Sequence, residues 1–107
     1  MAEHSMKLQR QPFEQMRGGH KTVEMRLYDE KRQQIAVGDV IVFRCEEDSL
    51  AVRVIGLHRF SDFAALYATL PHSQLGSDDP KDMERYYSKE EQKHYGVLGI
   101  EIERTTI

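Results

Sequence analysis

Hydrophobic and polar residues alternate at two places along the chain, which is typical of strands with one buried face. In residues 21–28, Val23, Met25 and Leu27 point one way and the polar residues between them point the other. A run that is apolar at every position, residues 40–43, indicates a strand buried on both faces. About five strands are predicted, over residues 6–9, 21–28, 40–43, 50–57 and 97–103.

Apolar residues at helical spacing, preceded by capping residues, predict three or four short helices. Residues 29–34 and 71–79 carry neither pattern and are predicted as irregular, and Gly56 is predicted to form a bulge in its strand. The helices are expected to begin near Pro12, Asp62, Pro80 and Ser88. Residues 1–107 therefore predict one domain of the α+β class, built as a small twisted β-barrel.

Composition limits the functions that such a domain can have. The chain has 107 residues, with 15 basic and 18 acidic ones, and its net charge of −3 excludes a protein that coats nucleic acid non-specifically. One cysteine, Cys45, excludes a disulfide framework and is expected in the core. The histidines show no ligand spacing, so neither a metal site nor a cofactor is expected. No apolar run has membrane-spanning length and no signal peptide is recognised, which predicts a cytoplasmic protein without membrane contact.

The charge is unevenly distributed along the chain. Residues 1–60 hold ten basic and nine acidic residues, whereas residues 61–107 hold five and nine. Two interpretations of the basic excess remain open: a solvated face, or a local anion site on an acidic protein. The acidic second part is compatible with a protein-interaction module whose partner contacts the helices after Ser61. Much of the positive charge falls on Arg17, Lys21, Arg26, Lys31 and Arg32.

The candidate chemistry lies at the start of the strand over residues 21–28. Period two places Thr22, Glu24 and Arg26 on one face, with Lys21 at the mouth of the strand. Glu24 and Arg26 would be roughly 6.5 to 7 Å apart along the strand, so they can share a bound group or pair with each other. Lysine and arginine can hold a phosphate or a carbonyl oxygen, and a glutamate can accept hydrogen bonds from a base edge or act as a base. The alternative is an exposed, self-neutralising strand.

Other residues near this strand have two interpretations each. His20 and Arg17 precede Lys21 and can contribute to a cleft, although a loop histidine is more often simply exposed. Tyr86 and Tyr87, with Tyr95, can stack on a base, but their spacing suits packing over the mouth of a barrel better.

The order and spacing of several short motifs resemble the ASCH family, named for activating signal cointegrator homology. They are Pro12-Phe13, Met16-Arg17-Gly18, the pattern Gly19-x-Lys21-Thr22-x-Glu24-x-Arg26, Gly38-Asp39 before an apolar strand, and Tyr95-Gly96-Val97. The similarity is greatest to short bacterial single-domain members and covers roughly residues 6–104, the expected core of the domain. It implies a β-barrel related to the PUA domain, with a cleft lined by Lys21, Glu24 and Arg26. It also implies a ligand that is RNA or resembles a nucleotide or nucleoside. Thr22, Arg17 and His20 are predicted as further contacts from their positions on or beside this strand.

One branch of that family removes the acetyl group from N-acetylcytidine. In its members a threonine stands where this chain has Glu24, next to the lysine matched by Lys21, and a later glutamate completes the set. A carboxylate cannot replace a hydroxyl nucleophile in forming an ordinary acyl-enzyme ester. A hydrolase would instead need Glu24 to activate a water while Lys21 polarises the carbonyl. The later carboxylate has four candidates: Asp82, Glu84, Glu90 and Glu91.

Overall fold

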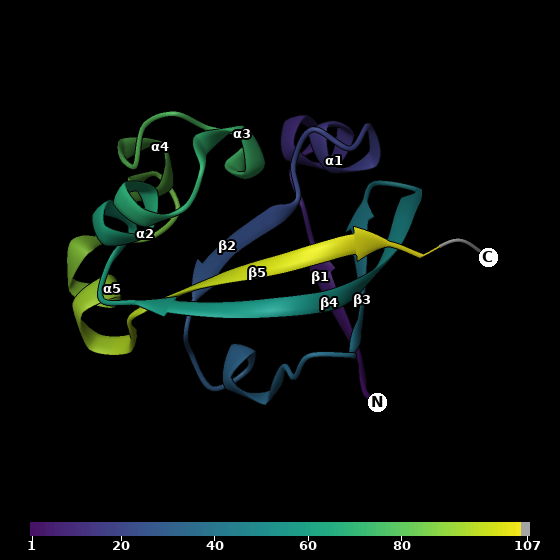
Figure 1. Ribbon diagram of the computed structural model, residues 1–107, viewed down its shortest axis with the longest axis horizontal. Coiled ribbons are helices and arrows are strands. Elements are labelled where there is room, and N and C mark those ends of the chain that lie inside the picture. Colours follow the sequence, from purple (N-terminus) through teal and green to yellow (C-terminus); the bar gives the residue numbers. More distant parts are fainter. Residues whose placement is uncertain (106–107) are drawn as a thin grey trace.

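The computed structural model describes residues 1–105, which form one curled sheet with short helices packed around it (Figure 1). The strands are β1 (Glu3–Lys7), β2 (Val23–Leu27), β3 (Val40–Cys45), β4 (Asp48–Phe60) and β5 (Val97–Arg104). The helices are α1 (Arg10–Arg17), α2 (Phe63–Thr69), α3 (His72–Leu75), α4 (Lys81–Glu84) and α5 (Lys89–Tyr95), with a 3-10 turn, η1, at Arg32–Gln34. The predicted α+β class is confirmed.

The five strands are ordered β1-β3-β4-β5-β2 in the sheet. β1 runs parallel to β3, and the other three pairs are antiparallel. The order leaves β1 and β2 as the two edge strands, and the sheet curls so that the predicted barrel is a half-barrel. The long strand β4 changes register between Val54 and Gly56, which confirms the predicted bulge.

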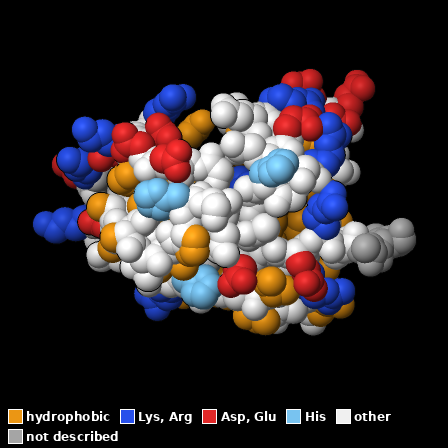
Figure 2. All heavy atoms as spheres, turned by 45° about the horizontal axis from the view of Figure 1, so that its top comes forward, with side chains coloured by type: hydrophobic (Ala, Val, Ile, Leu, Met, Phe, Trp, Pro, Cys, Tyr) orange, Lys and Arg blue, Asp and Glu red, His pale blue; other side chains and the backbone are white. Residues whose placement is uncertain are grey.

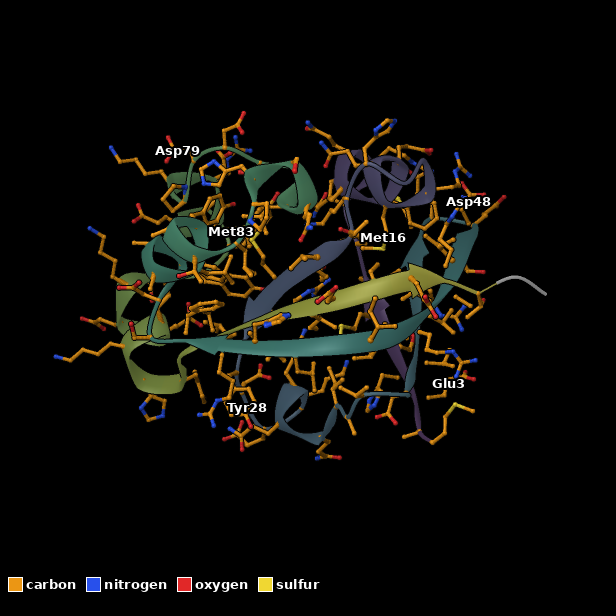
Figure 3. The ribbon with its side chains drawn as sticks, in the orientation of Figure 1. Glu3, Met16, Tyr28, Asp48, Asp79 and Met83 are labelled. Carbon is orange, nitrogen blue, oxygen red and sulfur yellow. The ribbon has the colours of Figure 1, made fainter. Side chains whose placement is uncertain are left out.

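Two hydrophobic clusters hold the helices to the sheet. The first lies inside the curl and joins α1, through Phe13 and Met16, to the inner side chains of β3, β4 and β5. The second joins β2 to α2 and α3, with Leu66 and Leu75 fully buried. The helices therefore divide into two groups, with α1 on one side of β2 and α2 to α5 on the other. Figure 3 shows this division, because Met16 and Met83 lie on opposite sides of β2.

Two of the predicted helix caps form in the structure, whereas α1 begins at Arg10, before Pro12, and α4 begins after Pro80, both without a side-chain cap. Asp62 accepts a hydrogen bond from the N–H of Ala65 at the start of α2. Ser88 and Glu91 form a complete capping box at the start of α5. These local contacts offset the cost of starting short helices, each of which is too short to be stable alone in water.

The structure differs from the sequence prediction in elements that depend on distant contacts. β1 begins at Glu3 rather than at residue 6, because its polar first half is ordered by parallel pairing with β3. The stretch over 71–79, predicted as irregular, contains α3, so residues 1–105 form five α-helices and not three or four. The charged loop after β2 contains η1.

Among residues 1–105, no helix is long and apolar enough to cross a membrane. In the same part of the chain, no three histidine, cysteine or carboxylate side chains come together as metal ligands would.

Candidate functional site

A cleft of about 860 Å³ lies over β2, between α1 and the segment from Leu75 to Tyr87. We call it the β2 cleft. Its floor consists of Lys21, Glu24, Met25 and Arg26. One wall comes from the end of β1 and from α1, the opposite wall from residues 75–87, and the end of β3 completes the rim.

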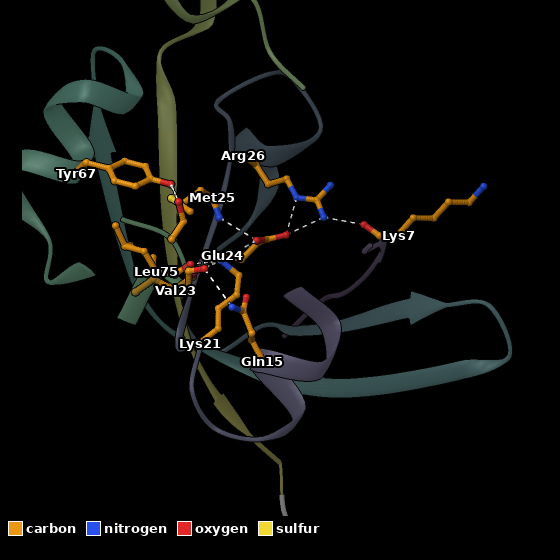
Figure 4. Close-up of polar contacts among 11 residues, drawn as sticks. Lys7, Gln15, Lys21, Val23, Glu24, Met25, Arg26, Tyr67 and Leu75 are labelled. Atoms are coloured by element: carbon orange, nitrogen blue, oxygen red, sulfur yellow. Dashed lines mark hydrogen bonds and ion pairs between the residues drawn. The ribbon is translucent and has the colours of Figure 1, made fainter. Parts of the chain in front are cut away.

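Lys21 is buried at the floor of the cleft, with 4% of its surface exposed. Its Nζ donates hydrogen bonds to the carbonyl oxygens of Val23 and Leu75, both at 2.8 Å, and lies 3.5 Å from Oε1 of Glu24 (Figure 4). Burial lowers the pKa of Lys21, and the charge of Glu24 opposes that change. Three acceptors around one nitrogen suit an ammonium group, which has three donors. Lys21 thus fixes the end of α3 to β2.

Glu24 is the centre of the buried charges, and it too is 4% exposed. Its Oε1 accepts from the N–H of Met25 at 3.1 Å, and its Oε2 accepts from Nε of Arg26 at 2.9 Å. Burial by itself raises the pKa of Glu24, but the positive charges of Arg26 and Lys21 outweigh burial and lower the pKa below its ordinary value. Glu24 is therefore a stable carboxylate between two cations.

Arg26 connects the floor to the opposite edge of the sheet. Its Nη2 lies 2.8 Å from Oε2 of Glu24 and donates to the carbonyl oxygen of Lys7 in β1 at 2.7 Å (Figure 4). The charge of Glu24 raises the pKa of Arg26 against the effect of burial. The guanidinium thus bridges β1 and β2, the two edges that the half-barrel leaves unpaired.

The structure brings together three of the six predicted site residues. Lys21, Glu24 and Arg26 meet at the floor, but Thr22 lies outside the β2 cleft because the regular strand begins only at Val23. The backbone N–H of Thr22 instead donates to the carbonyl of Gln74.

The other two predicted contacts also lie away from the cleft lining. His20 is exposed in the turn after α1. Arg17 forms an ion pair with Glu14 on the surface of α1.

The tyrosines divide between packing and exposure. Tyr87 stacks on Phe63 with ring centroids 5.7 Å apart, which fits the predicted packing role. Both Tyr86 and Tyr87 line the β2 cleft, and 51% of the surface of Tyr86 is exposed. Tyr95 does not line the cleft.

Among the four candidate later carboxylates, Asp82 alone lines the β2 cleft. Its Oδ2 accepts a hydrogen bond from the hydroxyl of Ser77 at 2.7 Å, and that hydroxyl accepts from the hydroxyl of Tyr67 at 2.9 Å. Glu84 faces a second cleft of about 590 Å³ near α5.

Sequence reasoning missed the contributions of α3 and β1 to this site. Gly76 has a left-handed backbone, with φ of 74°, and a Cβ there would lie 2.7 Å from Oε1 of Gln15. Gln15 in turn donates to the carbonyl of Gly76 at 3.1 Å, which joins α1 to the opposite wall. The pair Leu75-Gly76 is the sequence signal for this tight helix end, since glycine adopts the left-handed conformation at little cost.

Charged side chains are unevenly spread over the surface of the molecule. Figure 2 shows one face of the molecule, where basic and acidic side chains gather mainly toward the two ends and the middle holds few of them.

Comparison with protein-family profiles shows to which family the chain belongs. The profile of the ASCH domain matches residues 6–106, nearly the whole chain. The chain belongs to the ASCH domain family. The motif resemblance and the expected fold are thereby confirmed.

Two solved structures share this ASCH fold over their full lengths. The crystal structure of hypothetical protein PH0355 has a TM-score of 0.87 and 34% sequence identity, and the match covers 96% of this chain and 99% of that one. The solution NMR structure of protein PF0455 from Pyrococcus furiosus has a TM-score of 0.69 and 36% identity, with coverage of 98% and 99%. The comparison with curated proteins returns no match.

Proposed function

We propose that this ASCH domain binds RNA or a nucleotide-like ligand in the β2 cleft. The observation that carries the proposal is the buried group at its floor, where one carboxylate lies between two cations. Lys21 and Arg26 leave an excess of positive charge after pairing with Glu24. In a partly desolvated cleft, such an excess attracts an anion more strongly than the same charge in water.

The rim of the cleft supports a ligand that carries a base. Tyr86 offers an exposed ring beside the floor, and its centroid lies 6.4 Å from that of Tyr87, which is held by Phe63. A ring supported in this way can stack on an unpaired base without a large loss of side-chain entropy. Anion attraction at the floor and stacking at the rim together favour a nucleotide over a simple anion.

Tyr86→Ala tests this proposal without disturbing the buried charges. Stacking on one base is worth about 1–3 kcal/mol, so the variant should bind short single-stranded RNA about 5- to 150-fold more weakly. Fluorescence anisotropy with a labelled RNA hexamer of random sequence measures the change. Tyr28→Ala is the matched control, because the ring of Tyr28 contacts Arg59 and does not line the β2 cleft. Equal affinity of Tyr86→Ala and the original protein would contradict the proposed stacking.

Hydrolysis of an acylated nucleoside has less support from the geometry. A general base works best with a pKa near the working pH, whereas its neighbours lower the pKa of Glu24. Lys21 already donates to two carbonyls, so polarising a substrate carbonyl would require it to release one of them. A protein-interaction module would instead use the helices after Ser61, and a partner would map to them.

A further inference from the structure

Three cationic side chains lie along β1, at the rim of the β2 cleft and beyond it. Nζ of Lys31 donates to the carbonyl oxygen of Ser5 at 3.2 Å, and Nε of Arg44 donates to the hydroxyl of Ser5 at 3.2 Å. Lys7 lies two residues further along β1 and pairs in register with Arg44. We call Lys7, Lys31 and Arg44 the basic strip.

The basic strip lacks neutralising partners. All three side chains are exposed, and among residues 1–105 no carboxylate oxygen lies within 4.0 Å of their charged nitrogens. In contrast, the neighbouring Arg10 contacts Glu14, Glu46 and Asp48. Three unpaired cations side by side on a chain of net charge −3 form a local anion-binding surface.

The basic strip continues directly from the β2 cleft. Lys7 and Arg44 line the cleft, whereas Lys31 lies beyond it on the far side of Arg26 along β1. Ser5 and Lys7 are about 6.5 to 7 Å apart along the strand, so the strip is longer than one phosphate group. A mononucleotide in the cleft has no phosphate left for Lys31.

We propose that the basic strip binds the phosphates of a single-stranded RNA whose unpaired base occupies the β2 cleft. The inference rests on the proposed function and adds that the ligand is a strand of several nucleotides. An unpaired strand is required, because a base must be free of its duplex to stack on Tyr86.

A peptide strand is a poorer fit to the same edge of the sheet. Adding a strand to β1 would require free backbone groups along its outer edge. There the carbonyls of Ser5 and Lys7 already accept hydrogen bonds from Lys31 and Arg26. Because Lys31 and Arg26 occupy these carbonyls, a partner at this edge would contact mainly cationic side chains and not backbone groups.

The test compares two triple variants of equal net charge. Lys7→Gln/Lys31→Gln/Arg44→Gln removes the basic strip, and Lys81→Gln/Lys89→Gln/Lys93→Gln removes three exposed lysines around the second cleft, near α5. Binding of a random-sequence RNA hexamer and of the four nucleoside 5′-monophosphates is measured between 50 and 200 mM salt. Thermal melting of both variants verifies that they fold.

If the proposal is correct, removing the basic strip lowers the binding affinity more for a long ligand than for a short one. Its removal should weaken hexamer binding about 10- to 100-fold near 100 mM salt and make the slope of log K against log salt shallower by about 2. Mononucleotide affinities should fall by less than the hexamer affinity, because Lys31 lies beyond the cleft and only Lys7 and Arg44 of the strip line it. The control variant should bind the hexamer like the original protein.

Other outcomes separate the two proposals. Equal hexamer losses in both triple variants, or no loss in either, would overturn the basic strip while leaving the cleft proposal standing. Competition by a hexaglutamate peptide as strong as that by RNA would overturn the assignment to RNA. If the original protein binds neither the hexamer nor any mononucleotide, the proposed function fails and the strip assignment fails with it.

Discussion

The floor of the β2 cleft and the basic strip both contain cations, but burial gives these cations different roles. Lys21 at the floor is almost completely buried and is held by two carbonyls and a carboxylate. Lys7 in the strip is exposed and has no acidic partner in the described chain. A buried ion must be compensated, and losing one partner costs several kcal/mol, whereas exposed charges contribute little to stability. The floor cations should therefore stabilise the fold first, and the strip cations should act mainly on ligands.

Lys21→Met should have the largest effect on stability. It removes the ammonium group from two buried carbonyls and leaves Glu24 with one cation fewer. Breaking such a buried group should lower the free energy of unfolding by about 3–5 kcal/mol, measured by urea denaturation. The matched Lys7→Met should change it by less than about 0.5 kcal/mol. A loss below 1 kcal/mol for Lys21→Met would contradict the structural role of the floor.

Glu24→Gln should have a smaller effect that depends on pH. Because the folded-state pKa of Glu24 is lowered, its charge contributes stability that is fully present above the ordinary pKa of 4.5. That contribution is lost as the pH falls through the lower folded-state pKa. The difference in free energy of unfolding between the original protein and Glu24→Gln should be about 2 kcal/mol at pH 7 and should shrink at acidic pH.

Urea denaturation at pH 7 and pH 3 measures this difference. Glu103→Gln, at the exposed end of β5, serves as control and should change the free energy of unfolding by less than about 0.5 kcal/mol at both pH values. A constant difference at the two pH values for Glu24→Gln would show that its charge is not stabilised by the two cations.

Lys7→Gln/Arg44→Gln should have the smallest effect on stability, below about 0.5 kcal/mol. Both side chains are exposed, and Arg44 loses only a hydrogen bond to the hydroxyl of Ser5. Thermal denaturation at low and high salt measures the change. A loss above 2 kcal/mol would show that the strip holds β1 against β3 and would remove the contrast with the floor.

Local signals in the sequence predicted much of the fold. The alternation from Val23 to Leu27, the cap at Asp62 and the bulge at Gly56 each depend on a few neighbouring residues, and each occurs in the structure. The first half of β1 and helix α3 could not be predicted, since they are ordered by β3 and by Lys21, which are distant in the sequence.

The candidate site, like the fold, could be predicted only where it depends on residues that are close together in the sequence. Period two correctly placed Glu24 and Arg26 together, because both lie within the regular strand. It failed for Thr22, which precedes that strand. It also did not predict that Lys21 is buried, since the carbonyl of Leu75 that accepts its hydrogen bond is 54 residues away in the sequence. Arg44 escaped notice because only parallel pairing of β1 and β3 brings it beside Lys7.

The most direct test of ligand binding in the β2 cleft is an NMR titration of the isotope-labelled protein with the random-sequence RNA hexamer. We expect chemical-shift changes at the amides of Leu75, Gly76 and Tyr86 and at Nε of Arg26, which surround the cleft. The amide of Lys93, beside the second cleft, should not shift. Shifts confined to α5 and the second cleft, with none at Arg26 or Tyr86, would contradict the proposal.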